Sequence, residues 1–140
     1  MTDFLRLFAD NFSQLGKDNL HRLNQMYSQD VYFCDPLQEV QGLRSLRGHF
    51  ANLYGNAEQL DFDFRGFDYV REGEGYLRWQ MSFRHPHLRA GQLIEVEGCS
   101  HLKWRDKVYC HRDYFDAGAM VYEHVPVVGR LIRWLKAKMP

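Results

Sequence analysis

Asp35 and Pro36 are the neighbouring residues of this chain with the clearest potential for chemistry. They follow a short apolar run, Val31–Cys34. Proline has no N–H for a neighbouring strand and pushes the residue before it toward extended geometry, so the strand is predicted to stop at Asp35. A carboxylate at a strand end, beside buried sequence, either forms its own turn or acts as a base. The sequence leaves both roles open.

His111 and Asp113 are the second pair of chemical interest. They stand two residues apart in a run, 108–116, that is predicted to be a strand. Successive side chains of a strand point to opposite faces, so these two share one face. An aspartate beside a histidine can orient a proton shuttle. The alternative is a hydrogen-bonded polar layer that satisfies a cavity.

A metal site is not predicted. His85 and His87 flank Pro86, but zinc needs three or four ligands, and neither an acidic residue nor a cysteine stands nearby in sequence. The three cysteines are odd in number and lack CxxC spacing, which is typical of reduced, buried thiols. With neither a signal peptide nor a run of about 20 apolar residues, the expected location is the cytoplasm. We expect no cofactor.

The composition limits the class of protein. A chain of 140 residues is about one domain, and 15% aromatic residues favour a well-filled core or an aromatic-lined cavity. Eighteen basic and eighteen acidic side chains cancel, which argues against nucleic acid as a partner.

The elements that position these residues change type along the chain. Helical spacing predicts a helix over 2–15, a second one capped by Asp18 and reaching Tyr27, and a third that ends at Gly55-Asn56. After residue 59 the apolar residues alternate instead, and their parity slips at Gly66, which indicates a β-bulge that bends the sheet. Further strands are predicted over 77–83, 93–104 and 108–116. Helices followed by a bent antiparallel sheet predict an α+β fold in one domain.

The C-terminal segment 125–139 is predicted to be a helical extension. Val128, Leu131, Ile132 and Leu135 share one face, and the basic residues lie on another. The pair Val125-Pro126 suggests a chain that turns back, so we expect this helix to dock over the sheet or the pocket mouth rather than on a membrane.

Four segments together resemble the nuclear transport factor 2-like superfamily, which includes ketosteroid isomerase, the SnoaL-like polyketide cyclases and limonene-epoxide hydrolase. They are Met26–Val31 leading into Asp35-Pro36, then Gly42, then Gly98–Leu102, then His111–Asp116. The resemblance covers about residues 3–116. It implies a single SnoaL-like domain over 1–140: a cone-shaped, curved, largely antiparallel (mixed) sheet wrapped by three N-terminal helices, with a C-terminal helix.

The resemblance also implies a site. Asp35 matches the general base of ketosteroid isomerase-like members, but the two oxyanion donors of that enzyme fall near Asn11 and at Ser100, so steroid-type isomerisation is not predicted. His111, Asp113 and Phe115 would face the pocket, as in SnoaL-like cyclases. The full pocket lining that we expect is Asn11, Trp79, Met81, Phe83, Ser100, Leu102 and Phe115.

The predicted function is the binding of a small, largely apolar molecule. As an enzyme, the protein would be a cofactor-independent acid–base catalyst of isomerase, cyclase, dehydratase or hydrolase type. Asp35 would take a proton or activate water, and His111, oriented by Asp113, would return one. The alternatives are a non-catalytic ligand-binding module and a protein-interaction module that uses the outer sheet or the basic tail. A homodimer through the outer sheet face is expected at the level of the family.

Overall fold

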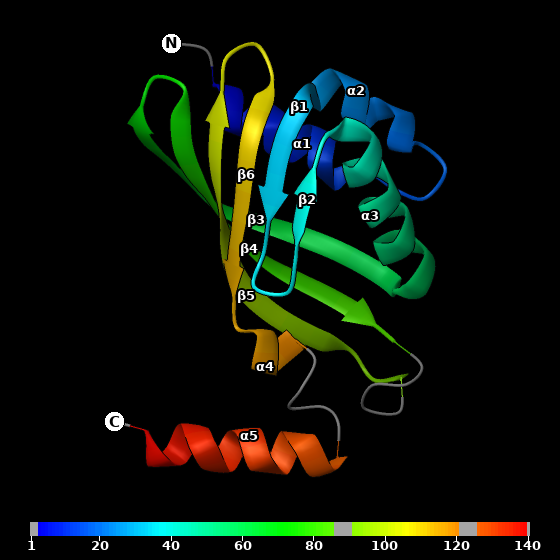
Figure 1. Ribbon diagram of the computed structural model, residues 1–140, viewed down its shortest axis with the longest axis vertical. Helices are drawn as coiled ribbons and strands as arrows, with labels where there is room; N and C mark the ends of the chain where they lie inside the picture. Colours follow the sequence, from blue (N-terminus) through cyan, green and yellow to red (C-terminus); the bar gives the residue numbers. More distant parts are fainter. Residues whose placement is uncertain (1–2, 86–90, 121–125, 140) are drawn as a thin grey trace.

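The protein, a computed structural model that describes residues 3–85, 91–120 and 126–139, is built around one curved sheet (Figure 1). The strands are Tyr27–Cys34 (β1), Glu39–Gln41 (β2), Glu58–Arg71 (β3), Glu74–Arg84 (β4), Ile94–Trp104 (β5) and Val108–Phe115 (β6). Their order is β2-β1-β6-β5-β4-β3. The pair β1 and β6 is parallel and every other neighbouring pair is antiparallel, so the sheet is mixed, as expected.

The bend predicted at Gly66 is present. The pairing of β3 with β4 shifts by one residue between Phe64, opposite Trp79, and Gly66, opposite Arg78. A bulge of this kind twists and bends the strand that carries it. The long strands β3, β4 and β5 therefore curve around the helices and form the wall of the cone.

The helices before β3 lie against the concave face of the sheet. They are Phe4–Ser13 (α1), a 3-10 turn at Leu20–Arg22 followed by Leu23–Met26 (α2), and Leu43–Asn56 (α3). Helix α1 begins where the Asp3 side chain accepts a hydrogen bond from the Arg6 amide. Its buried residues, Leu5, Phe8, Ala9 and Phe12, repeat at three- and four-residue spacing, which is why one face of the helix packs on the sheet.

The second predicted helix was too long and wrongly capped. Asn19, not Asp18, precedes the helical turn, and its side chain braces the loop by accepting from the Gly16 amide and donating to the Gln14 carbonyl. Tyr27 is already the first residue of β1 and is fully buried. Tyr27 continues the helical spacing of Leu20 and Leu23, but pairing with the sheet and burial in the core favour the strand conformation at this residue.

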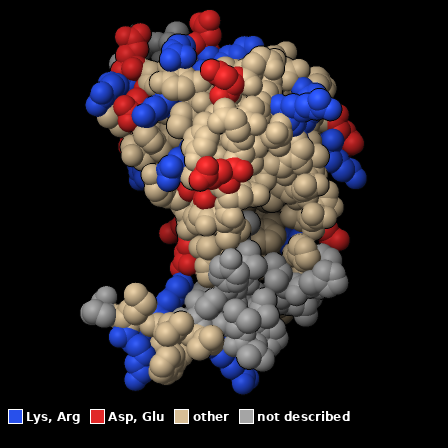
Figure 2. All heavy atoms as spheres, viewed as in Figure 1, with Lys and Arg blue, Asp and Glu red and all other residues tan. Residues whose placement is uncertain are grey.

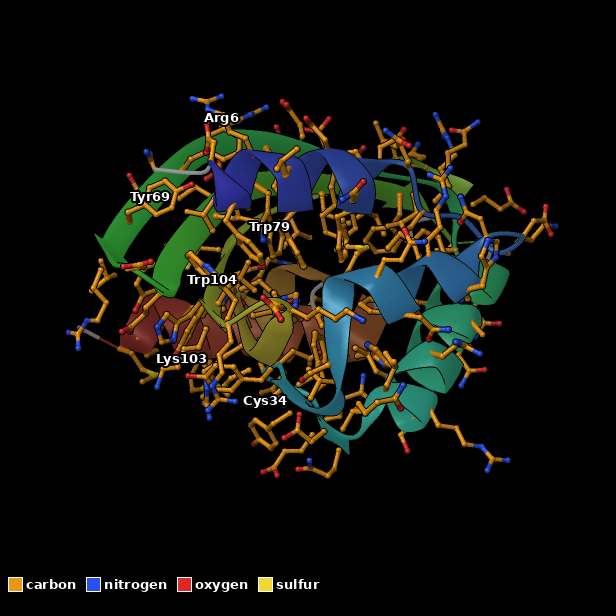
Figure 3. All side chains as sticks on the ribbon, turned by 90° about the horizontal axis from the view of Figure 1, so that it is seen from above. Arg6, Cys34, Tyr69, Trp79, Lys103 and Trp104 are labelled. Carbon is orange, nitrogen blue, oxygen red and sulfur yellow. The ribbon has the colours of Figure 1, made fainter. Side chains whose placement is uncertain are left out.

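Aromatic rings fill the interior of the cone. The Phe12 ring meets those of Phe62 and Phe50 edge-to-face at centroid distances of 5.1 and 5.7 Å, and Phe62 meets Trp79 at 5.4 Å. In Figure 3, Trp79 and Trp104 lie between α1 and the sheet. Trp104 stacks on Phe4 at 4.4 Å. The deep part of the cone is thus a packed core, with little room for a ligand.

Two helices follow the sheet: Ala117–Met120 (α4) and Pro126–Lys138 (α5). Helix α5 lies beside the open end of the cone, set apart from the sheet (Figure 1). Its exposed residues include Leu131, Trp134 and Leu135. Among the described residues, none of the helices is long and apolar enough to cross a membrane.

Candidate functional site

A chain of buried hydrogen bonds joins β1, β4, β5 and β6 on the inner face of the sheet. The Tyr27 hydroxyl lies 2.8 Å from Nδ1 of His111, and Nε2 of His111 lies 2.6 Å from Oδ1 of Asp113. The Ser100 hydroxyl donates to the same Oδ1 at 2.5 Å, and Nε1 of Trp79 donates to Ser100 at 2.9 Å. The register places these groups together, because Ser100 stands opposite Asp113.

His111 is held by a partner at each ring nitrogen. Nε2 can donate to the Asp113 carboxylate, which only accepts, and the Tyr27 hydroxyl can then donate to Nδ1. Burial, and then the nearby Asp113 carboxylate, raises the pKa of Tyr27 well above its usual range. The predicted pairing of His111 with Asp113 on one face is therefore present, within a network that is satisfied at each link.

The space beside this network is small. The gap bounded by Ser100, His111, Asp113 and the surrounding aromatic rings has a volume of about 10 Å³. A single water needs about this much room. A ligand of several heavy atoms would therefore require the aromatic layer around Phe62 and Trp79 to move.

Asp35 shapes its own turn. Its Oδ1 accepts from the amides of Leu37 at 2.8 Å and Gln38 at 3.0 Å, and its own amide donates to the Gln38 carbonyl at 3.0 Å. This is the Asx-type arrangement that aspartate commonly forms in turns. The turn places Gln38 beside α3, where Nε2 of Gln38 lies 3.0 Å from Nδ1 of His49.

The larger inner hollow opens at the mouth of the cone, between α3 and strands β3 and β4. Its volume is about 450 Å³. Its wall is mostly apolar, and its polar groups are amides and imidazoles. The lining consists of Gln38, His49, Asn52, Leu53, Asn56, Ala57, Leu60, Met81, Phe83 and His85. None of these described lining residues is Lys, Arg, Asp or Glu. Its volume falls within the range of about 300–1,000 Å³ that is usual for small-molecule pockets.

His49 is the titratable group best placed to meet a molecule in this hollow. The Gln38 amide donates to Nδ1, so the neutral ring carries its proton on Nε2 and can donate it to a ligand. Burial lowers the pKa of His49 below 6.5, and nearby His111 adds to this effect, although Asp35 and Asp113 oppose it. At neutral pH the hollow is therefore lined by an uncharged imidazole.

The expected pocket lining divides into several environments. Met81 and Phe83 line the hollow, Ser100 lines the small gap, and Trp79 is shared between that gap and the outer face of the sheet. Leu102 is fully buried in the core, and Phe115 packs against the core with its ring centroid 6.4 Å from Trp79.

The expectation for Asn11 was wrong. Asn11 is exposed and borders a polar surface hollow with Gln14, His21, Arg22, Gln25 and Met26. Helical spacing explains the error, because Phe8 and Phe12 already occupy the inner face of α1 and turn Asn11 to solvent.

The histidines around Pro86 give little support for a metal. His85 lines the hollow, whereas Pro86 and His87 lie outside the described residues. In the part of the chain that the structure describes, there is no group of three or more His, Cys, Asp or Glu side chains arranged to hold a metal ion.

A second hollow lies on the outer face of the sheet, where the homodimer was expected. It has a volume of about 560 Å³, and charged side chains border it, including Arg65, Glu97 and the ion pair of Arg78 with Asp68 at 2.8 Å. Tyr76 and Tyr114 supply aromatic area. The homodimer stays a prediction.

The fold and the residue pattern agree with a match to a known family. The model of the SnoaL-like domain matches residues 2–111. The chain belongs to the SnoaL-like family. No curated protein matches it.

Solved structures of SnoaL-like and related proteins share this fold. A protein of Catenulispora acidiphila with a ketosteroid isomerase-like fold, in complex with trimethylamine, is 13% identical with a TM-score of 0.72, over 88% of this chain and 92% of that one. A putative SnoaL-like polyketide cyclase of Shewanella putrefaciens is 18% identical with a TM-score of 0.70, over 86% and 94%. An epoxide hydrolase of M. tuberculosis similar to limonene-epoxide hydrolase is 12% identical with a TM-score of 0.69, over 94% and 96%. At these identities the likeness concerns the fold.

Reasoning from sequence missed His49 and Gln38 as pocket residues. His49 stands beside Leu46 and Phe50 on a helix, a position typical of a residue at the border of the core, so its sequence context does not point to a pocket. The available signal was polar: His49, Asn52 and Asn56 recur at three- and four-residue spacing on α3, so they form a stripe along one side of the helix.

Proposed function

We propose that this SnoaL-like protein binds a small, uncharged and largely apolar molecule in the hollow between α3 and strands β3 and β4. The observation that carries the proposal is the cavity of about 450 Å³, whose described lining includes amides and imidazoles but not a charged side chain. An ionised ligand would lose its hydration there without gaining a counter-charge. An uncharged one gains from burial against Leu53, Leu60, Met81 and Phe83.

The polar end of the ligand would lie at His49. Its Nε2–H is directed by the hydrogen bond that Gln38 gives to the other ring nitrogen, so it suits a carbonyl, ether, epoxide or hydroxyl oxygen as acceptor. Asp35 would act as a positioning residue, because its turn sets Gln38 in place.

Abstraction of a proton from the bound molecule, followed by its return, is a second candidate function. It is favoured by one observation, the carboxylate of Asp113 held by His111 and Ser100 on the inner face of the same sheet. In this proposal the Asp113 carboxylate takes a proton from a carbon of the bound molecule and returns it to another position, while His111, hydrogen-bonded to Tyr27, orients that carboxylate. The aromatic layer at Phe62 and Trp79 would have to open for contact.

Binding can be tested with a panel of small cyclic ketones, ethers, epoxides and alcohols, matched with amines and carboxylates of similar size. A ligand at about 100 times its Kd stabilises a protein by about 2.7 kcal/mol, which for a domain of this size raises Tm by about 8 °C. We expect such shifts with uncharged compounds only. Stabilisation by the ionised compounds alone would contradict the proposal.

Two matched variants localise the binding. Ala57→Trp places an indole ring in the hollow, whereas Ala51→Trp makes the same change on the exposed side of α3. Ala57→Trp should abolish the thermal shift and Ala51→Trp should preserve it. Equal binding by both variants would place the ligand elsewhere.

Catalysis needs a separate measurement with the compounds that bind. Asp113→Asn keeps an oxygen that can accept from Ser100 and His111 but cannot take up a proton as a carboxylate does. We expect it to bind ligand normally and to lose solvent-deuterium exchange or turnover, while exposed Asp63→Asn retains both. Equal rates in the two variants would exclude Asp113 as the base.

A further inference from the structure

Helix α5 has the composition of a membrane-surface helix. Among its described side chains, the helical spacing brings Leu131 and Leu135 to one side, with Trp134 beside them. Arg130, Arg133, Lys136 and Lys138 are its charged residues, and acidic residues do not occur after Glu123. Arg130, Arg133 and Lys136 fall on the other side, and the Lys138 ammonium lies 5.9 Å from the centroid of the Trp134 ring. A basic side opposite leucine and tryptophan is the pattern of helices that lie in the plane of an interface.

Three apolar residues of α5 are open to solvent. Leu131 is 55%, Trp134 56% and Leu135 44% exposed, although an apolar stripe of this kind normally covers a core. The helix lies apart from the sheet at the open end of the cone. An ionic contact between Lys136 and Asp116 holds it near the start of α4. Of the two positions that the sequence suggested, over the sheet or over the pocket mouth, α5 does not take the first, since it lies apart from the sheet.

The charge of the chain is divided between α5 and the body. Four of the eighteen basic residues lie in α5, so the rest of the chain carries fourteen basic and eighteen acidic side chains. Figure 2 shows Lys and Arg atoms at both ends of α5. Because the body is net negative, an anionic surface attracts the protein through α5 and repels the rest, which fixes the orientation of approach.

We propose that α5 binds the surface of an anionic phospholipid bilayer. Its 13 residues span about 20 Å, too short to cross a bilayer but long enough to lie along one. Leu131, Trp134 and Leu135 enter the boundary between headgroups and acyl chains, and Arg130 and Lys138 contact lipid phosphates, while Lys136 keeps its contact with Asp116. The mouth of the cone then faces the bilayer, from which an apolar ligand could enter.

The test uses the full-length protein and co-sedimentation with vesicles of phosphatidylcholine, with and without about 30% phosphatidylglycerol. We expect binding to the anionic vesicles only, weakened by added salt, with a blue shift of tryptophan fluorescence. Each basic residue removed should weaken binding about fivefold. Arg130→Gln/Lys138→Gln should therefore bind about 25-fold more weakly and keep the Lys136–Asp116 contact.

Lys17→Gln/Arg44→Gln is the matched control, since it removes the same charge from exposed positions on the body. It should change binding less than twofold. Trp134→Ser should lose the blue shift as well as most of the binding. Equal binding of all variants, or the absence of binding to anionic vesicles, would overturn the proposal. So would a concentration-dependent dimer that Trp134→Ser dissolves, because α5 would then pack on a second copy of the chain.

Discussion

Replacing Asp35 by asparagine and by alanine separates its two predicted roles. As a general base, Asp35 would fail equally in both variants, since neither side chain takes up a proton at neutral pH. As the residue that shapes the turn, it needs only Oδ1, which accepts from the amides of Leu37 and Gln38. Asparagine retains this acceptor and is also common in Asx-type turns, whereas alanine has none.

The expected magnitude follows from the two hydrogen bonds. Each contributes about 0.5–1.5 kcal/mol net, and the turn is solvent-exposed, so the lower half of the sum applies. We expect Asp35→Ala to lower the free energy of unfolding by about 1–2 kcal/mol and Tm by about 3–6 °C. Asp35→Asn should stay within about 0.5 kcal/mol of the wild type.

Urea unfolding gives the stabilities, and the imidazole resonances of His49 report on the hydrogen bond from Gln38. In Asp35→Ala that hydrogen bond should weaken together with ligand affinity, and in Asp35→Asn both should persist. If Asp35→Asn keeps the stability and the His49 resonances of the wild type yet loses turnover of a bound compound, Asp35 is a catalytic base and the positioning role is refuted.

Three further changes test the interior and the hollow. Tyr27→Phe leaves Nδ1 of buried His111 without its donor and should cost about 1–3 kcal/mol in urea unfolding, with Tyr54→Phe as the milder control. Gly98→Ala places a Cβ 2.5 Å from the Trp79 ring and 2.7 Å from a backbone oxygen, so overpacking should cost about 1–3 kcal/mol in the same assay. Because the pKa of His49 is lowered in the folded protein, the unfolded chain binds a proton at this histidine at a higher pH than the folded chain does. Stability and ligand binding should therefore fall as pH drops below 6.5. His49→Gln should remove this pH dependence from both measurements.

The sequence predicts most of the fold because local pattern and tertiary packing agree there. Alternating residues in 60–65 and 77–83 fall in β3 and β4, and Gly66 lies at the bulge because the parity of the apolar residues changes at that point. Pro36 lies just beyond the end of β1 at Cys34. The short strand β2 and the helix α4 were missed, since segments of three and four residues are too short to show a period.

The site was predictable only in part. Strand alternation brings His111 and Asp113 to one face, and the structure pairs them. The alternation of residues along a strand does not show how far the cone is filled. That depends on rings from α1 and β3, which meet on the concave side of the sheet. Phe12 and Phe62, about 50 residues apart in sequence, close the space beside Asp113 at a centroid distance of 5.1 Å.

This filling explains why binding is expected at the mouth and not in the depth of the cone. Toward the open end, the inward-facing residues of β4 become Met81 and Phe83, and helix α3 ends at Asn56. The wall opens there, and the polar residues of α3 take the place of the aromatic layer. The site therefore begins where the helix stops covering the sheet, and the turn held by Asp35 forms its edge. The gap beside Asp113 is bounded by Phe12 and Phe62 among other rings, so smaller residues at these two positions would widen the space next to the His111–Asp113 pair.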